Sequence, residues 1–202
     1  MRAIVNIRGC NGSGKSTIPL QMMENDPEFW VWPIIGSDGK RIASFTIFPN
    51  LGWIALGTYF NKTGGLDTIS GPEATHMCMF AALDAFPEYN VLMEGIIAST
   101  TFSSYSAMLK EAEQRYGKDL KVVVMSLMPP VETAISRVYQ RNNGKPVKEE
   151  LIHAKWGMVY RSHKKFKDAG FTAIRVDSSK VPKDRMMEAF MKSVYKRLEE
   201  GV

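Results

Sequence analysis

A glycine-rich segment near the start of the chain carries the clearest chemical signal. Residues 9–17 read Gly-Cys-Asn-Gly-Ser-Gly-Lys-Ser-Thr and match the pattern G-x-x-x-x-G-K-[ST], with a β-branched run before them and a helix-like segment after them. Glycines let the backbone curl so that successive N–H groups face phosphate oxygens, and the start of a helix adds partial positive charge. The segment therefore predicts a phosphate-binding loop for a nucleotide. The expected nucleotide-binding residues are Gly9, Asn11, Gly12, Ser13, Gly14, Lys15, Ser16 and Thr17.

Two side chains of this loop and one distant acid are expected to handle the phosphates and a metal ion. Lys15 should reach the β- and γ-phosphates, and the Ser16 hydroxyl is placed to bind the Mg²⁺ that bridges them. Glu94 ends a buried-strand run, residues 90–94, and ligands bind at the carboxyl ends of strands in open parallel sheets. Glu94 could thus help to hold Mg²⁺ or act as a base. Asp177 is its one rival, and an ordinary strand-end acid is the plainer interpretation.

Three further charged residues are candidates for catalysis. Asp67 lies in a glycine-flanked loop, residues 64–69, where a carboxylate could approach a substrate or could simply accept backbone hydrogen bonds. Arg137 and Arg141 are four residues apart on a predicted helix and project from the same face. An exposed turn follows them, so residues 137–155 could form a lid whose arginines clamp the transferring phosphoryl group. The alternative is a solvated basic face.

Strands and helices alternate along the chain, which predicts an α/β doubly wound, mostly parallel sheet in a single domain spanning residues 1–202. An antiparallel β-meander inserted near residues 29–60 is predicted from three strand-like runs, two of them joined by Asp38-Gly39. Pro19 is expected a turn and a half into the first helix, where it would bend the chain. The expected strands are 3–7, 29–35, 41–48, 51–59, 90–94, 120–127 and 171–176, and the expected helices are 15–25, 71–86, 103–116, 131–141, 147–169 and 182–199.

Composition narrows the class of protein. The 202 residues are 45% hydrophobic and 23% charged, which suits one soluble domain and excludes disorder or low complexity. Two cysteines and three scattered histidines have no metal-type spacing, and no run of about 18 apolar residues occurs. We therefore expect a cytoplasmic protein without a zinc site. The net charge of +5 would suit a polyanionic partner without requiring one.

The phosphate loop alone does not choose among kinases, GTPase switches and ATP-driven motors. A GTPase needs a guanine-reading N-K-x-D, and Asn61-Lys62-Thr63-Gly64 has Gly in place of the Asp. A ring motor normally needs a longer core than 202 residues leave room for. A small phosphotransferase needs a metal-organising acid, a base and cations near the phosphoryl group, and candidates for all three are present.

The motifs as a set resemble the P-loop kinases of bacteriophages, especially the 5-hydroxymethyluracil DNA kinases of thymidine hypermodification. The resemblance spans most of the chain, although only the phosphate loop is specific by itself. It rests on the loop with its trailing Ser16-Thr17-Ile18-Pro19, on Gly57-Thr58-Tyr59 with residues 64–69, on Glu94-Gly95-Ile96 followed by Ser99-Thr100-Thr101-Phe102, and on residues 137–146.

The resemblance implies transfer of the ATP γ-phosphoryl group to the 5-hydroxymethyl oxygen of a modified pyrimidine in DNA, inside the host cytoplasm. In that scheme Asp67 or Glu94 accepts the hydroxyl proton. The residues themselves offer a basic segment, 161–167, and the aromatic meander, whose Trp30, Trp32 and Trp53 could stack on a base or form core. A kinase of free nucleosides or nucleotides and an ATP-hydrolysing binding switch remain as alternatives.

Overall fold

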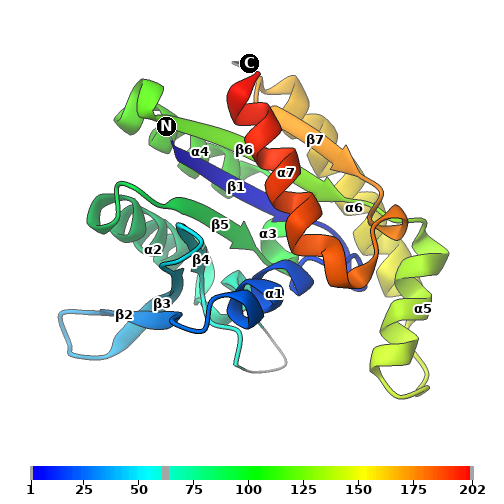
Figure 1. Ribbon diagram of the computed structural model, residues 1–202. Helices are drawn as coiled ribbons and strands as arrows, with labels where there is room; N and C mark the ends of the chain where they lie inside the picture. Colours follow the sequence, from blue (N-terminus) through cyan, green and yellow to red (C-terminus); the bar gives the residue numbers. More distant parts are fainter. Residues whose placement is uncertain (1, 61–63, 201–202) are drawn as a thin grey trace.

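Seven strands form one sheet in the computed structural model, which describes residues 2–60 and 64–200 (Figure 1). Their order across the sheet is β2-β3-β4-β5-β1-β6-β7. The strands are β1 (Arg2–Arg8), β2 (Trp30–Ile35), β3 (Arg41–Phe48), β4 (Trp53–Leu56), β5 (Asn90–Glu94), β6 (Leu120–Leu127) and β7 (Thr172–Val176). The helices are α1 (Thr17–Asn25), α2 (Gly71–Ala85), α3 (Ile96–Thr100), α4 (Ser103–Tyr116), α5 (Val131–Arg141), α6 (Glu149–Asp168) and α7 (Met186–Glu199).

Five neighbouring strands, from β4 to β7, run parallel, which confirms the predicted doubly wound sheet. Ile7 near the end of β1 pairs with Glu94 of β5 on one side and with Met125 of β6 on the other. The carboxyl ends of these three strands therefore meet at one edge of the sheet, which is where ligands bind in folds of this type.

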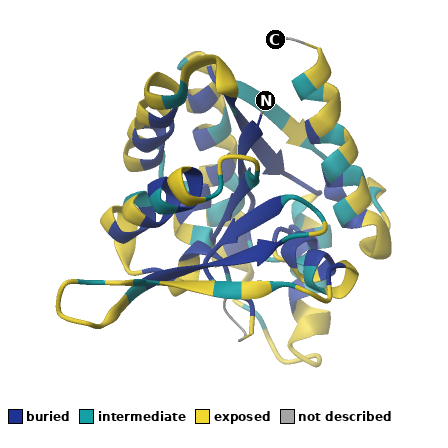
Figure 2. Cartoon of the chain, turned by 60° about the vertical axis from the view of Figure 1, so that its left-hand side comes forward, coloured by how far each residue is buried: buried dark blue, intermediate teal, exposed yellow. Residues whose placement is uncertain are grey.

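Helices cover both faces of the sheet because consecutive strand residues point to opposite sides. Ile4 contributes to an apolar cluster with buried residues of α2, α4 and α6, such as Leu83 and Phe166. Its neighbour Val5 contributes to the opposite cluster with α1 and α7, including Met22 and Phe190. Figure 2 shows the buried strands between helices whose outer sides are exposed.

The predicted meander is confirmed, and it extends the main sheet. β2 pairs antiparallel with β3, and β3 with β4, whereas β4 pairs parallel with β5. The Asp-Gly turn joins β2 and β3, and Gly39 adopts a φ of 76° there. Trp53 is fully buried, so it is a core residue, but Trp30 and Trp32 on the outermost strand are each 42% exposed.

Three predicted boundaries need correction. The first helix begins at Thr17, so Pro19 lies in its first turn. A backbone N–H at that position has no acceptor within the helix, so proline removes no helical hydrogen bond there. The expectation that Pro19 would bend the helix by removing such a bond was wrong. The third meander strand is only β4, because the chain leaves the sheet at Gly57, whose φ is 90°. The last helix begins at Met186, after a short 3-10 turn at Lys183–Arg185.

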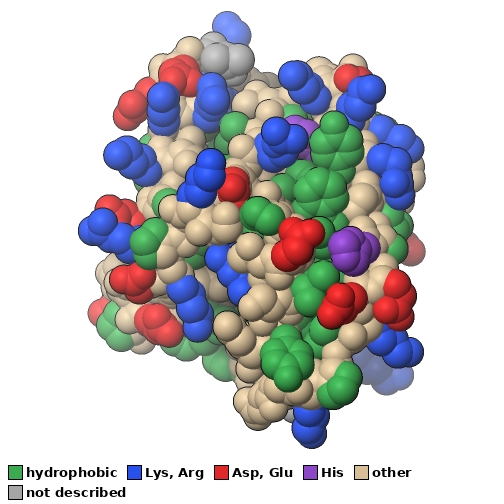
Figure 3. Space-filling model, turned by 90° about the vertical axis from the view of Figure 1, so that its right-hand side faces the viewer, with side chains coloured by type: hydrophobic (Ala, Val, Ile, Leu, Met, Phe, Trp, Pro, Cys, Tyr) green, Lys and Arg blue, Asp and Glu red, His purple; other side chains and the backbone are tan. Residues whose placement is uncertain are grey.

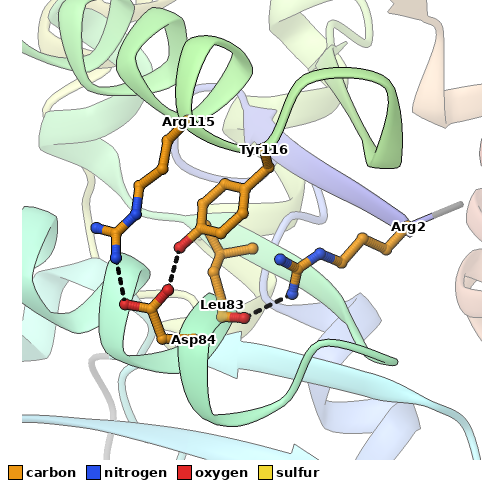
Figure 4. Close-up of polar contacts among 5 residues, drawn as sticks. All are labelled: Arg2, Leu83, Asp84, Arg115 and Tyr116. Carbon is orange, nitrogen blue, oxygen red and sulfur yellow. Dashed lines mark hydrogen bonds and ion pairs between the residues drawn. The ribbon is translucent and has the colours of Figure 1, made fainter.

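A polar cluster lies at the amino-terminal end of β1, opposite the end that meets the glycine-rich loop (Figure 4). Asp84 at the end of α2 accepts hydrogen bonds from Arg115 (2.8 Å) and from the Tyr116 hydroxyl (2.6 Å), both on α4. Arg2 of β1 donates to the carbonyl of Leu83 and lies over the Tyr116 ring. These contacts fix α2 and α4 to β1.

Within the described residues, the structure contains no helix of the length and apolarity that crossing a bilayer requires.

Candidate active site

The glycine-rich loop connects β1 to α1 at the carboxyl edge of the sheet, as predicted. Gly12 and Gly14 have φ values of 79° and 93°, which L side chains rarely adopt. A side chain at Gly12 would also collide with the backbone carbonyl of Ala134 in α5. Glycine is therefore required where the loop curls, and the loop packs directly against the helix that follows β6.

Lys15 and Ser16 lie where the loop enters α1. Lys15 is only 5% exposed, and its ammonium group donates a hydrogen bond to the Cys10 carbonyl at 3.2 Å. Burial lowers the pKa of Lys15, while the nearby charge of Glu94 opposes that shift. The Ser16 hydroxyl lies 3.3 Å and 3.4 Å from the two carboxylate oxygens of Glu94. The structure thus brings these two predicted site residues into contact.

Glu94 is a buried carboxyl group beside the glycine-rich loop. It is 1% exposed, and burial raises its pKa to about 7; the charge of Asp67 also raises it, whereas Lys15 and the Ser16 hydroxyl lower it. The rival acid, Asp177, follows β7 and accepts hydrogen bonds from the backbone N–H and hydroxyl of Ser179. Glu94 rather than Asp177 therefore faces Ser16.

Two glycines let the chain pass close to Glu94. Gly65 donates a backbone hydrogen bond to the Thr58 carbonyl, which joins the two segments that flank residues 61–63. Its φ is 61°, and a Cβ atom there would lie 2.5 Å from Oε1 of Glu94. A Cβ at Gly57 would in turn collide with the Gly65 carbonyl. Residues 57–59 and 64–69 thus wrap the buried carboxylate, and most of Asn61-Lys62-Thr63-Gly64 lies outside the described residues.

Asp67 is the second acid of the site. Both of its carboxylate oxygens accept a hydrogen bond from the Ile96 N–H, each at 3.0 Å, at the start of α3. Asp67 is exposed, and its negative charge raises the pKa of both Glu94 and Lys15. The expected backbone hydrogen bond is present, and the same geometry holds the carboxylate beside Glu94.

Tyr59 is a residue of the site that was not among the predicted catalytic or binding residues, although it belongs to the Gly57-Thr58-Tyr59 motif. The residue is 5% exposed, and its hydroxyl has no hydrogen-bond partner among the residues that the structure describes. Burial and the charge of Glu94 raise the pKa of Tyr59, so the phenol is close to the carboxylate. The available signal was its position at the end of the third predicted strand, since a parallel strand next to β5 ends beside Glu94.

The two arginines of α5 both reach the loop, but in different ways. Arg137 donates hydrogen bonds to the carbonyls of Gly12 (3.4 Å) and Ser178 (3.1 Å), and the Ser178 hydroxyl donates to the Ser13 carbonyl. Arg141 lies one turn further along α5, and its charge lowers the pKa of Lys15. Arg137 therefore braces the outside of the loop, while Arg141 remains available to a ligand.

A cavity of about 260 Å³ separates α5 and α6 next to the loop. Asn11, Arg141, Asn142, Lys148 and Lys155 contribute its polar lining, and all three charged groups are cationic. Lys155 was not predicted, because it lies on a different helix from the arginines and only packing brings the helices together.

The arrangement suits a nucleoside triphosphate with a divalent cation. A curled backbone, a buried ammonium group and nearby arginines can hold phosphates, while a hydroxyl and a carboxylate 3.3 Å apart are ligands that Mg²⁺ accepts. Among the described residues, no three His, Cys, Asp or Glu side chains converge on one point. Mg²⁺ needs no such cage, since it usually keeps several waters and binds substrate phosphates.

A parallel sheet with this loop and an acid on the adjacent strand defines a P-loop kinase fold. The structure of the YorR protein of Bacillus subtilis, in complex with phosphorylated GDP, has the same fold: the TM-score is 0.52 at 15% identity, over 98% of each chain. The sequence model of the 5-hmdU DNA kinases matches residues 2–188, so the chain belongs to the 5-hmdU DNA kinase family.

Two phage proteins illustrate the relationship. The 5-hmdU DNA kinase of Bacillus phage SP10 is 40% identical over 198 residues, which cover 97% of this chain and 30% of the relative. The 5-hmdU DNA kinase 1 of Salmonella phage ViI is 35% identical over 156 residues, covering 76% of this chain and 66% of the relative. The chain thus spans less than a third of the first relative and about two thirds of the second.

Proposed function

We propose that this protein transfers the γ-phosphoryl group of ATP to the 5-hydroxymethyl oxygen of 5-hydroxymethyluracil in DNA. The observation that carries the proposal is the pairing of Ser16 with the buried Glu94, 3.3 Å apart at the carboxyl edge of the sheet. Membership of the 5-hmdU DNA kinase family supplies the acceptor. The whole chain would act as one kinase domain, with residues 137–155 as its lid.

The loop backbone and Lys15 would hold the triphosphate, since both present donors to its oxygens. Ser16 and Glu94 would hold Mg²⁺, which when bound neutralises charge on the β- and γ-phosphates. Thr17 starts helix α1, and the N-terminus of this helix would face the phosphates. Positioning and electrostatic stabilisation account for most of the catalysis in this reaction class.

In the transfer step, the 5-hydroxymethyl oxygen forms a bond to the γ-phosphorus as the bond to the β,γ-bridging oxygen breaks. The hydroxyl proton passes to a carboxylate. We assign that role to Asp67, because it is exposed beside Glu94 while Glu94 is buried against Ser16. Arg141 would neutralise charge on the moving phosphoryl group, and Arg137 would assist by holding the loop in shape.

The direct test supplies γ-labelled ATP and Mg²⁺ to four acceptors in parallel: DNA containing hydroxymethyluracil, unmodified DNA, the free hydroxymethyl nucleoside and its nucleotide. Label in the modified DNA alone is the expected result, and the Lys15→Ala variant should not produce it. Label in the monomers instead would identify a kinase of free nucleosides or nucleotides. Released phosphate without a labelled acceptor would identify an ATP-hydrolysing switch.

A further inference from the structure

A second cavity lies outside the catalytic centre, between α6 and β7 at the edge of the sheet. Its volume is about 410 Å³. The lining residues are Tyr160, His163, Lys164, Lys167, Ala173 and Arg175. None of them belongs to the phosphate loop or to the surroundings of Glu94, so the proposed chemistry does not use them.

The charged side chains that line this cavity are all positive. Lys164, Lys167 and Arg175 line it without an acid, and none of the three takes part in an ion pair among the described residues. The pKa of His163 is lowered by burial and by the charges of Arg175, Lys167 and Arg8. His163 is held in place by a 3.0 Å hydrogen bond with the Ser126 hydroxyl. The cavity therefore concentrates uncompensated positive charge.

An aromatic pair borders the cationic group. The rings of Trp156 and Tyr160 are parallel within 3° with centroids 6.1 Å apart, and Tyr160 is 45% exposed. Trp156 is anchored because its indole N–H donates to the Pro129 carbonyl at 2.9 Å. Figure 3 shows one face of the molecule, on which Lys and Arg side chains lie among apolar, acidic and histidine side chains. Cations interleaved with exposed aromatic rings are typical of surfaces that bind nucleic-acid strands.

Helix α6 connects this cavity to the catalytic centre. Lys148, which precedes its first turn, and Lys155 line the cavity beside the loop, and Lys164 and Lys167 line the second one. At about 1.5 Å per helical residue, the span from Lys148 to Lys167 is roughly 30 Å, the length of about nine base pairs. Lys155 and Lys164 are nine residues apart and so project from opposite sides of α6, which means that the two cavities border the same helix on different sides.

We propose that the cavity between α6 and β7 binds the sugar–phosphate backbone of the DNA substrate away from the target nucleotide. Lys164, Lys167 and Arg175 would contact phosphates there, and the Tyr160 ring would pack against the sugar or an exposed base. The inference rests on the proposed function, because that function makes DNA the substrate. It explains how a kinase domain would hold a polymer by contacts that a free nucleotide cannot make.

The test compares two double variants on the same helix. K164A/K167A removes two cavity cations, and R161A/K165A removes two exposed cations of the same helix that do not line the cavity. Binding of an unmodified 20-base-pair duplex is measured by fluorescence anisotropy from 50 to 200 mM salt. Each lost phosphate contact should reduce the slope of log K against log salt by about 0.9, so K164A/K167A should lose about 1.8. The control pair should lose less than about 0.5, and both variants should keep the wild-type KM for ATP.

A second measurement uses the unaltered protein. The pKa of His163, followed by NMR, should rise when the duplex binds, because a phosphate stabilises the imidazolium ion. Equal slopes for the two variants, or a His163 pKa that DNA does not move, would overturn the proposal. A third result would also overturn it. If inorganic phosphate at matched ionic strength raises the pKa of His163 equally, and the duplex cannot displace that phosphate, the cavity is a site for small anions.

These binding experiments need no phosphoryl transfer, so they test the DNA-binding surface separately from the proposed kinase function. Salt-dependent binding through Lys164 and Lys167 in a protein that labels only monomers would support the surface and contradict the DNA kinase reaction. Labelled DNA together with equal slopes for both variants would do the reverse.

Discussion

The Ser16 hydroxyl lies 3.3 Å from Oε2 of Glu94, although 78 residues separate the two in the chain. The contact exists because β1 and β5 are parallel neighbours, which brings the start of α1 to the end of β5. A buried acid whose pKa is raised to about 7 by burial thereby becomes a partner for the Ser16 hydroxyl.

Glu94→Gln should abolish turnover and stabilise the isolated protein at neutral to alkaline pH. The folded-state pKa of Glu94 is about 7, against an ordinary value of 4.5. The native state therefore binds more protons between these values, so the wild type loses stability as the pH rises from 4.5 to about 7. Such a shift corresponds to about 3 kcal/mol at most.

Urea unfolding of both proteins in EDTA, at pH 5 and pH 8, checks this. The advantage of the Gln variant should be small at pH 5 and full at pH 8. An advantage that does not grow with pH would show that the pKa of Glu94 is not raised in the folded protein.

Asp67→Asn should fold normally and lose at least about 10²-fold in phosphoryl transfer. The amide oxygen can still accept the hydrogen bond of the Ile96 N–H, but it cannot take the proton of the acceptor hydroxyl. Single-turnover rates with saturating ATP measure the effect. Near wild-type rates would mean that Asp67 only holds α3 in place and that Glu94 is the base.

Gly65→Ala should reduce activity far more than Gly71→Ala. Both glycines have a positive φ, 61° and 83°, so both substitutions carry backbone strain of roughly 1–2 kcal/mol. Only at Gly65 would the added methyl group press on Glu94, whereas nothing lies within 4 Å of it at Gly71. A displaced catalytic group can cost about 10²-fold in rate. The measurement compares kcat/KM of the two variants at temperatures equally far below the Tm of each, which separates displacement of Glu94 from loss of stability. Equal losses of kcat/KM in the two variants would contradict the prediction.

Arg137→Ala and Arg141→Ala should fail in different ways. Arg137 donates to the Gly12 and Ser178 carbonyls, so its loss should destabilise the protein by about 1–3 kcal/mol and raise KM for ATP. Arg141 lines the cavity beside Asn11, so its loss should leave stability unchanged and lower kcat by about 10²-fold. Thermal unfolding and steady-state kinetics on both variants separate the roles, and a large loss of stability in Arg141→Ala would refute this division.

Local signals were sufficient for much of the architecture. Glycine spacing identifies the phosphate loop because the curled backbone needs positive φ at Gly12 and Gly14. Alternating strand and helix periodicities predict the parallel sheet, and the end of a buried run places Glu94 at its carboxyl edge. These features depend on residues adjacent in the chain, so the amino-acid sequence by itself determined them.

Only the tertiary structure decided which side chains meet. It brought Tyr59 to Glu94 and Lys155 to the loop, and it turned Arg137 toward the Gly12 carbonyl while its neighbour one turn away, Arg141, remained available. It also buried Trp53 and left Trp32 partly exposed on the outermost strand. Such contacts depend on how helices from distant segments pack across the sheet, and no short-range pattern in the sequence encodes that packing.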